Sequence, residues 1–134
     1  MEYLRMTEAD QELIEAATSV IRRNYVPGKH RVGAAVRGKS GRIFTGVHLN
    51  SSAIDICAEA VALGTAASNG EREFECIVAV ALTEGKAPQV LSPCGVCREL
   101  IKFYGPGTQV IFVVDGALRK CRANDLLPGP YIRP

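Results

Sequence analysis

Cys57-Ala58-Glu59 and Pro93-Cys94-Gly95-Val96-Cys97 are the two stretches around which the rest of this sequence is arranged. They read C-x-E followed, after a long gap, by P-C-x-x-C. Three cysteine thiolates can hold Zn²⁺ and leave its fourth position open, which is the arrangement of catalytic rather than structural zinc. The pattern therefore predicts a catalytic zinc centre assembled from two distant parts of the chain.

The residue types in this pattern also indicate a reaction. Zinc lowers the pKa of a bound water from about 16 to about 7, so hydroxide is available at neutral pH. Glu59 lies two residues after the first cysteine and can exchange protons with such a water without being a ligand. The combination matches the signature of zinc-dependent deaminases that act on bases. We therefore expect Glu59 to be the catalytic acid and base.

Length and composition set limits on the alternatives. A chain of 134 residues with 47% apolar and 22% charged residues is expected to form a single domain, residues 1–134. A net charge of +2 gives no electrostatic footprint for nucleic acid. The N-terminal residues have no apolar core of signal-peptide length, and no apolar run approaches a membrane span. Five cysteines without a secretion signal favour reduced thiols in the cytoplasm.

The first half of the chain predicts a helix, a hairpin and a second helix. Thr7 is a plausible N-cap with Asp10 as its capping-box partner, and Pro27-Gly28 ends the helix. Its apolar face is formed by Leu13, Ile14, Ala17, Val20 and Ile21. Residues 32–36 and 42–49 are expected to pair as a hairpin. A polar connection over 50–55, with Asp55 as a possible N-cap, leads to a helix over 57–68.

The second half alternates strands and helices. Residues 76–82 form an apolar run typical of a central strand, and 83–89 are expected to be a loop. A helix over 94–103, with Pro93 at its mouth, precedes strands over 109–114 and 119–122 and a helical turn over 124–127. This order predicts an α/β fold, namely a three-layer α/β/α sandwich with a central mixed five-stranded sheet.

These boundaries place all three candidate ligands at helix starts. A helix N-terminus carries about half a positive charge, which favours thiolate over thiol. Cys94 and Cys97 are one helical turn apart, so both sulfurs can reach one ion.

A structural zinc site or a redox pair is the alternative for C-x-x-C. A closed site needs a fourth ligand, and the spare cysteines are Cys76, in an apolar strand, and Cys121, which has no partner at ligand spacing. Neither reading explains Glu59 and Pro93.

Beyond the zinc pattern, the chain resembles the cytidine deaminase superfamily, and most of all its small homotetrameric cytidine deaminase and blasticidin-S deaminase branch. Val32-Gly33-Ala34-Ala35 is similar to the V-G-A-A strand of cytidine deaminases. Segments similar to blasticidin-S deaminase are 41–47, 63–67, 91–95 and 126–128 with Tyr131. The resemblance implies a cytidine deaminase-like fold and a homotetramer.

It also implies roles for individual residues. Cys57, Cys94 and Cys97 would be the zinc ligands, and Glu59 the proton shuttle. The backbone N–H of Ala58 would bind the pyrimidine carbonyl oxygen, and the backbone carbonyl near Ser92 would receive the leaving amine. We add Tyr131 to the candidate substrate contacts on the same resemblance.

The substrate pocket departs from this family. Where cytidine deaminases carry N-x-E to hold the ribose, His48 and Asn50 stand here, so the sugar-binding carboxylate is missing. His30 replaces an aromatic residue, and we include it with His48 and Asn50 among the candidate substrate contacts. Ala60 replaces an arginine that helps to balance the zinc charge. Arg98 is a candidate to compensate, or a structural cap.

Three classes of function follow. The leading one is hydrolytic deamination of cytidine or deoxycytidine to the uridine product and ammonia. The second is deamination of another amino-heterocycle, such as the antibiotic blasticidin S or a free base. The third is a zinc-stabilised binding module without catalysis. A polynucleotide substrate is disfavoured because the chain has no basic run.

Overall fold

The computed structural model describes all 134 residues. The first helix, α1, spans Glu8–Asn24, and Thr7 is its N-cap as predicted. The capping box is complete, because Asp10 N–H donates to Thr7 Oγ1 and Thr7 N–H donates to the Asp10 carboxylate. The buried side of α1 includes Leu13, Ala17, Val20 and Ile21 from the predicted apolar face.

The main sheet is mixed. Its principal strands are β1 (Val32–Gly38), β2 (Ile43–Val47), β5 (Phe74–Ala81), β7 (Gln109–Val114) and β8 (Ala117–Arg122). They lie in the order β2-β1-β5-β7-β8, with β5 and β7 parallel and the other neighbours antiparallel. The predicted hairpin and the central position of β5 are therefore confirmed.

A sixth strand corrects the expectation of five. β6 (Gln89–Leu91) begins where the sequence predicted the end of a loop, and it pairs antiparallel with residues 79–81 of β5. β7 pairs only with Cys76 and Ile77 on the same edge of β5. A three-residue strand is too short to show an alternating pattern, so nothing in the sequence indicated it.

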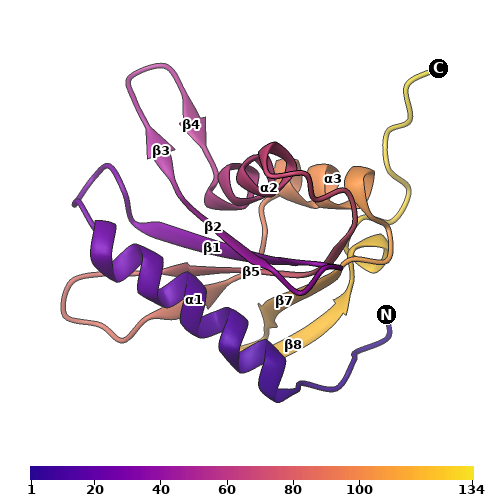
Figure 1. Cartoon of the computed structure of the whole chain (residues 1–134), viewed down its shortest axis with the longest axis horizontal. Coiled ribbons are helices and arrows are strands. Elements are labelled where there is room, and N and C mark those ends of the chain that lie inside the picture. The colour runs from indigo at the N-terminus through magenta and orange to yellow at the C-terminus, as the bar shows by residue number, and fades with distance from the viewer.

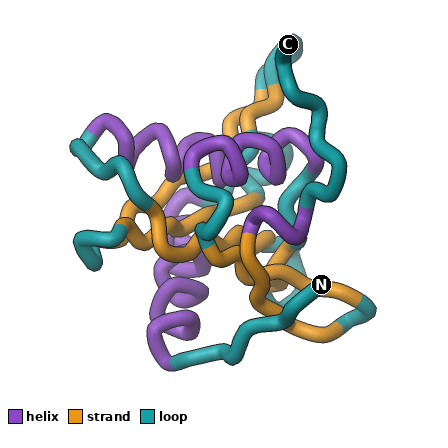
Figure 2. Tube along the Cα trace, turned by 90° about the vertical axis from the view of Figure 1, so that its right-hand side faces the viewer, coloured by secondary structure: helices purple, strands orange, loops and turns teal.

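The helices form the outer layers (Figure 1). α1 covers one face of the sheet, while α2 (Ala58–Ser68) and α3 (Gly95–Tyr104) lie on the other. Each face has its own core, one of 7 buried residues beneath α1 and one of 17 beneath α2 and α3. Figure 2 shows the strands lying between the helices and the C-terminal segment projecting away from them. The predicted three-layer sandwich is confirmed.

Residues 49–56 form a small hairpin, which corrects the expected polar connection. β3 (Leu49–Asn50) and β4 (Asp55–Ile56) pair antiparallel, with Asn50 opposite Asp55, and the hairpin projects from the body (Figure 1). Because pairing keeps the backbone extended through Ile56, α2 cannot begin earlier than Ala58. Its N-cap is therefore Cys57 rather than Asp55.

A glycine sets how closely α2 approaches the sheet. A Cβ added at Gly46 in β2 would lie 2.6 Å from the backbone nitrogen of Ala62 and 2.8 Å from Val61 Cβ. The absence of a side chain therefore brings the backbone of α2 against β2. This contact fixes the depth at which the residues at the start of α2 lie.

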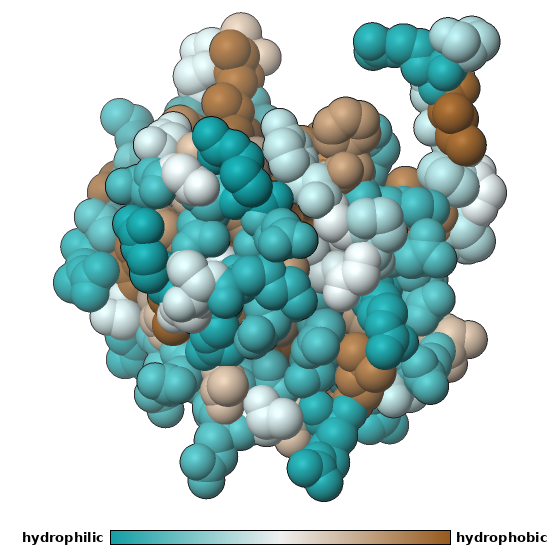
Figure 3. Space-filling model, turned by 45° about the vertical axis from the view of Figure 1, so that its right-hand side comes forward, coloured by the Kyte–Doolittle hydropathy of each residue, from teal (hydrophilic) through white to brown (hydrophobic).

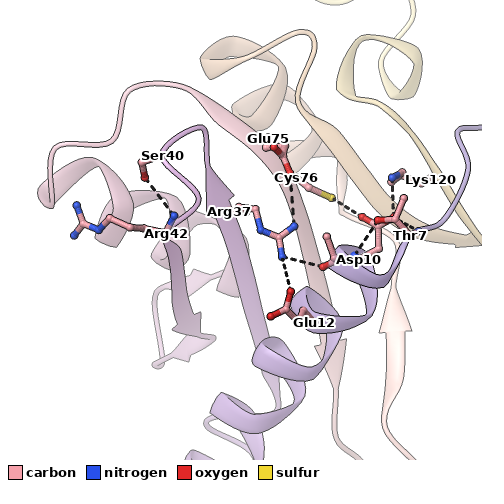
Figure 4. Close-up of polar contacts among 10 residues, drawn as sticks. Thr7, Asp10, Glu12, Arg37, Ser40, Arg42, Glu75, Cys76 and Lys120 are labelled. Carbon is pink, nitrogen blue, oxygen red and sulfur yellow. Dashed lines mark hydrogen bonds and ion pairs between the residues drawn. The ribbon is translucent and has the colours of Figure 1, made fainter.

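Polar groups are buried between α1 and the sheet (Figure 4). The Asp10 carboxylate pairs with Lys120 Nζ at 2.7 Å, and both side chains are less than a tenth exposed. The Cys76 thiol contacts the same carboxylate at 3.9 Å. Nearby, Arg37 donates to the carbonyl of Ala9 at 2.9 Å. These contacts join α1 to β1, β5 and β8.

The last helical element is a short 3-10 helix over Ala123–Leu126, close to the predicted helical turn. A tail without helix or strand follows it. None of the helices is both long enough and apolar enough to cross a membrane. Figure 3 shows a largely hydrophilic surface, with apolar groups on the projections at the top of the view. Exposed apolar residues at such sites are Leu49, Ile54, Tyr131 and Ile132.

Candidate metal centre

The starts of α2 and α3 bring three sulfurs together. Cys57 is the N-cap of α2, Cys94 is the N-cap of α3, and Cys97 is the third residue of α3. Pro93 therefore precedes the N-cap instead of occupying the first helical position that proline favours. The three Sγ atoms lie within 4.8 Å of one another, and those of Cys57 and Cys94 are 3.5 Å apart. A tetrahedral zinc ion with Zn–S bonds of about 2.3 Å separates its sulfurs by about 3.8 Å, so the cluster fits this ion.

The local charge environment differs among the three thiols. Burial alone would raise the pKa of Cys94, but hydrogen bonds from the Cys97 and Val96 backbone and from the other two thiols outweigh it and lower that pKa. The N–H of Cys97 donates to Cys94 Sγ at 3.5 Å, so this sulfur caps its own helix. The prediction that helix starts favour thiolates holds for Cys94.

At the other two cysteines burial is the larger effect. It raises the pKa of Cys57 to about 11, assisted by the hydrogen bond and negative charge of Cys94. Burial and the neighbouring Glu59 carboxylate also raise the pKa of Cys97. Three thiolates and a carboxylate at this separation repel one another, and a divalent cation between the sulfurs relieves that repulsion. The donor set therefore suits a metal that displaces thiol protons.

Glu59 is the second residue of α2 and is only 6% exposed. Burial raises the pKa of its carboxyl group, while hydrogen bonds with its own backbone N–H and with the Cys97 side chain partly oppose this rise. The carboxylate therefore lies beside a sulfur of the cluster. A carboxyl group whose pKa is raised accepts a proton more readily than an exposed one, as general acid–base catalysis requires.

The cluster opens into a cleft of about 170 Å³. Ala58 and Ser92, two of the predicted substrate contacts, line it together with Cys57, Cys94 and Glu59. Ala58 is the first residue of α2, where backbone N–H groups have no partner within the helix. The Ser92 hydroxyl donates to the carbonyl of Val113 at 2.5 Å and fixes the end of β6 against β7.

His48, another of the predicted substrate contacts, also lines the cleft. Its side chain is 8% exposed, and its Nε2 is hydrogen-bonded to Asp55 Oδ1. Asp55 lines the same cleft, as do Arg31, Val32, Ala79 and Leu91. Sequence reasoning missed these residues because their approach to the cysteines depends on strand pairing and not on spacing along the chain.

The other predicted contacts lie elsewhere. His30 is behind His48, where its Nδ1 is hydrogen-bonded to the His48 backbone carbonyl at 2.7 Å. The Asn50 side chain donates to the carbonyl of Gly28 at 3.1 Å and does not line the cleft. Tyr131 is 81% exposed and lines a separate hollow formed by α3 and the C-terminal tail.

The remaining cysteines and Arg98 have structural contacts. Cys76 and Cys121 are fully buried and are not part of the sulfur cluster, and burial raises their pKa values to about 12 and about 11. Arg98 donates to the carbonyls of Pro93 and Leu126, so it holds the start of α3 against the 3-10 helix. Ala60 is on the outer side of α2, beside an apolar hollow.

Comparison with known proteins places this arrangement in context. Residues 7–113 match the family described as the cytidine and deoxycytidylate deaminase zinc-binding region. The chain is 40% identical to the blasticidin-S deaminase of Bacillus cereus over 139 aligned residues, covering 99% of each chain. It is 33% identical to the cytidine deaminase of Sporosarcina psychrophila, covering 90% of each.

Solved structures are similar throughout their length. The crystal structure of cytidine deaminase from Burkholderia pseudomallei superimposes with a TM-score of 0.74 at 33% identity, covering 94% of this chain and all of that one. The cytidine deaminase from Bacillus anthracis gives a TM-score of 0.77 at 26% identity, covering 90% and 88%.

Proposed function

The chain belongs to the cytidine and deoxycytidylate deaminase family, and on that premise we propose that it is the zinc-dependent hydrolase that converts the 4-amino group of cytidine or deoxycytidine to a carbonyl. The products are the uridine nucleoside and ammonia. The observation that carries this proposal is the cluster of three sulfurs, which lies with the buried Glu59 carboxyl group at a cleft lined by Cys57, Cys94 and Glu59.

Each residue of the cleft has a task in this reaction. Cys57, Cys94 and Cys97 would hold the zinc ion, which when bound would supply an activated water at neutral pH. Glu59 takes a proton from the attacking water and delivers protons to the ring nitrogen and the departing amine. Its burial supports this role, because burial raises the pKa of the carboxyl group and so makes it a better proton acceptor.

Two backbone groups orient the ring. The unpaired N–H of Ala58 at the start of α2 donates to the pyrimidine carbonyl oxygen. The carbonyl of Ser92 accepts from the 4-amino group, and the bond between the Ser92 hydroxyl and β7 holds that carbonyl in place. His48 lines the wall of the cleft beside the substrate, and its backbone carbonyl is hydrogen-bonded to the His30 ring.

Blasticidin S is a second candidate substrate. The similarity to the blasticidin-S deaminase of Bacillus cereus supports it, because 40% identity extends over nearly the whole of both chains. The chemistry at the zinc centre is the same for both candidates. They differ in the group attached to the cytosine ring.

We also propose that the chain assembles as a homotetramer in the cytoplasm. An apolar hollow of about 130 Å³ between α2 and α3 is lined by Leu63, Phe74, Leu100 and Tyr104, and Val96 and Phe103 stand exposed on α3. Such a surface supports contact between subunits. Asn50 and Tyr131 would act on substrate only within such an assembly or after movement of the hairpin or tail. Sedimentation equilibrium tests the assembly, and a monomer would refute it.

Ammonia release from cytidine, deoxycytidine, blasticidin S and cytosine tests the reaction itself. Glu59→Gln should keep zinc but lose about 10³ to 10⁴-fold in kcat, because one residue serves several proton transfers. Glu73→Gln is the matched control, since it removes one exposed carboxylate at the far end of β5. Substantial turnover by zinc-loaded Glu59→Gln would remove Glu59 from the mechanism.

A further inference from the structure

Asp55 is an exposed carboxylate held in the wall of the cleft by a buried histidine. Its side chain is 72% exposed, whereas that of its partner His48 is 8% exposed. The contact joins Asp55 Oδ1 to His48 Nε2 and leaves the second carboxylate oxygen free of any protein partner. Both residues line the cleft that Cys57, Cys94 and Glu59 also line. The pair therefore lies beside the ring-binding site, not at a distant surface.

The surroundings of His48 determine which of its nitrogens carries the hydrogen. Nδ1 is buried and has no hydrogen-bond partner. A hydrogen at Nδ1 would be a buried donor without an acceptor, which is unfavourable, so the hydrogen is on Nε2 and is donated to Asp55. Asp55 is thus oriented by the Nε2–H of His48, and its second carboxylate oxygen stays available to a ligand. An anionic acceptor of this kind binds hydroxyl, amino and guanidino groups strongly.

The position of Asp55 in the fold determines which part of a substrate it can contact. It is on β4, opposite Asn50 across the two-residue ladder, and the Asn50 side chain is turned away to the Gly28 carbonyl. The carboxylate is therefore contributed by β4 and not by β3. Ring-orienting groups are deeper, at the start of α2. A carboxylate on the projecting hairpin meets what is attached to the ring and not the ring itself.

We propose that Asp55 binds the substituent on the cytosine ring by accepting hydrogen bonds from its donor groups, and that His48 is the residue that positions Asp55. This inference rests on the proposed deaminase function and adds its substrate selectivity. The donors are sugar hydroxyls in cytidine or a cationic amino or guanidino group in blasticidin S. Free cytosine has no such substituent, so its binding and turnover do not depend on Asp55.

The test compares Asp55→Asn with wild type on cytosine, cytidine and blasticidin S. Asparagine keeps the shape and can still accept from His48, but it loses the charge. We expect kcat/KM to fall about 10- to 100-fold for the substituted compounds, as for the loss of a charge-assisted hydrogen bond, and to change less than about twofold for cytosine. Glu73→Gln, with the same chemical change away from the cleft, should alter none of the three.

Binding provides a second readout that does not need turnover. Calorimetric Kd values for the three compounds are measured with zinc-loaded Glu59→Gln and with Glu59→Gln/Asp55→Asn. A loss confined to blasticidin S identifies the cationic group as the partner, and a loss shared with cytidine identifies the hydroxyls. Equal losses for all three compounds, or none, would overturn the inference. Wild type that binds these compounds yet releases no ammonia would refute the proposed function, while the Kd values still decide the role of Asp55.

The role of His48 is tested by the ratio of kcat/KM for cytidine to kcat/KM for cytosine. His48→Ala should lower kcat/KM for cytidine relative to cytosine, because Asp55 loses its orientation. His48→Gln, whose side-chain amide can donate to Asp55, should restore most of that ratio. An equal loss for both substrates in His48→Ala would show that His48 only supports the fold.

Discussion

Replacing Lys120 with methionine should destabilise the protein, because it leaves the Asp10 carboxylate buried without its cation. Asp10 and Lys120 are 3% and 6% exposed and 2.7 Å apart. Removing one partner of a buried pair costs about 3–5 kcal/mol. Asp10 keeps the hydrogen bond from the Thr7 N–H at 2.8 Å and the weak contact with the Cys76 thiol. We therefore expect the lower end, about 3 kcal/mol.

A second substitution, at Asp10, tests whether the loss of stability in Lys120→Met comes from the unpaired carboxylate. Asp10→Asn/Lys120→Met removes both charges, and the asparagine oxygen can still accept from Thr7. The double variant should therefore recover about 1–2 kcal/mol relative to Lys120→Met alone, a value comparable to the coupling energies of about 0.5–3 kcal/mol between contacting residues. Against a typical total stability of about 5–15 kcal/mol, both changes are large enough to measure.

Urea unfolding of zinc-saturated protein at one fixed concentration gives the free energies, since metal and assembly both alter apparent stability. The matched control is Arg122→Met. Arg122 is on the same strand as Lys120, and its exposed ion pair with Glu2 has an N···O distance of 2.8 Å. That change should cost less than about 1 kcal/mol. If Lys120→Met cost no more than Arg122→Met, the buried pair would not stabilise the contact between α1 and β8.

Three further predictions concern the sulfurs and the packing of α2. Zinc content should fall towards zero and unfolding should become easier when alanine replaces any one of the clustered cysteines, Cys57, Cys94 or Cys97, since the ion joins two helix starts. Cys76→Ala and Cys121→Ala should keep full zinc, and loss of metal in either would contradict a three-cysteine centre. In chelator-treated protein at pH 8, Cys94 should react with a disulfide reagent before Cys76, because only thiolate reacts and a lower pKa means more thiolate at that pH. Mass spectrometry of the modified protein gives the order, and fast labelling of Cys76 would contradict it. Gly46→Ala should destabilise the protein because its Cβ meets the backbone of α2, whereas Gly107→Ala, with open space around it, should not; equal unfolding midpoints for the two variants would show that α2 moves freely away from β2.

Sequence patterns predict the helices and strands of this fold that are long enough to show a repeated apolar pattern or that have a capping motif at their ends. α1 has both a complete capping box and a repeated apolar face, and its bounds agree with the pattern at both ends. The sulfur cluster was predictable from its sequence signature. Cys94 and Cys97 are one helical turn apart at the start of α3, and Cys57 is the N-cap of α2. β5 was identifiable because strands on both edges and helices on both faces make nearly every residue of it apolar.

The wall of the cleft was not predictable in this way, because it depends on the register of two very short strands. Reading along the chain places Asn50 where a sugar-binding carboxylate is expected. In the structure the register places Asp55 directly across from Asn50. That register depends on the Ser51 turn, where the Ser51 hydroxyl accepts from the Ile54 N–H at 3.1 Å and the Ser51 N–H donates to the Ile54 carbonyl at 2.8 Å. Two-residue strands have no period from which a register can be inferred, and a shift by one residue would turn the Asp55 side chain to the opposite side. If Asp55 binds the ring substituent as proposed, selectivity depends on the turn at Ser51 as much as on the carboxylate. A change in the length of this loop should then alter substrate choice while the zinc centre remains intact.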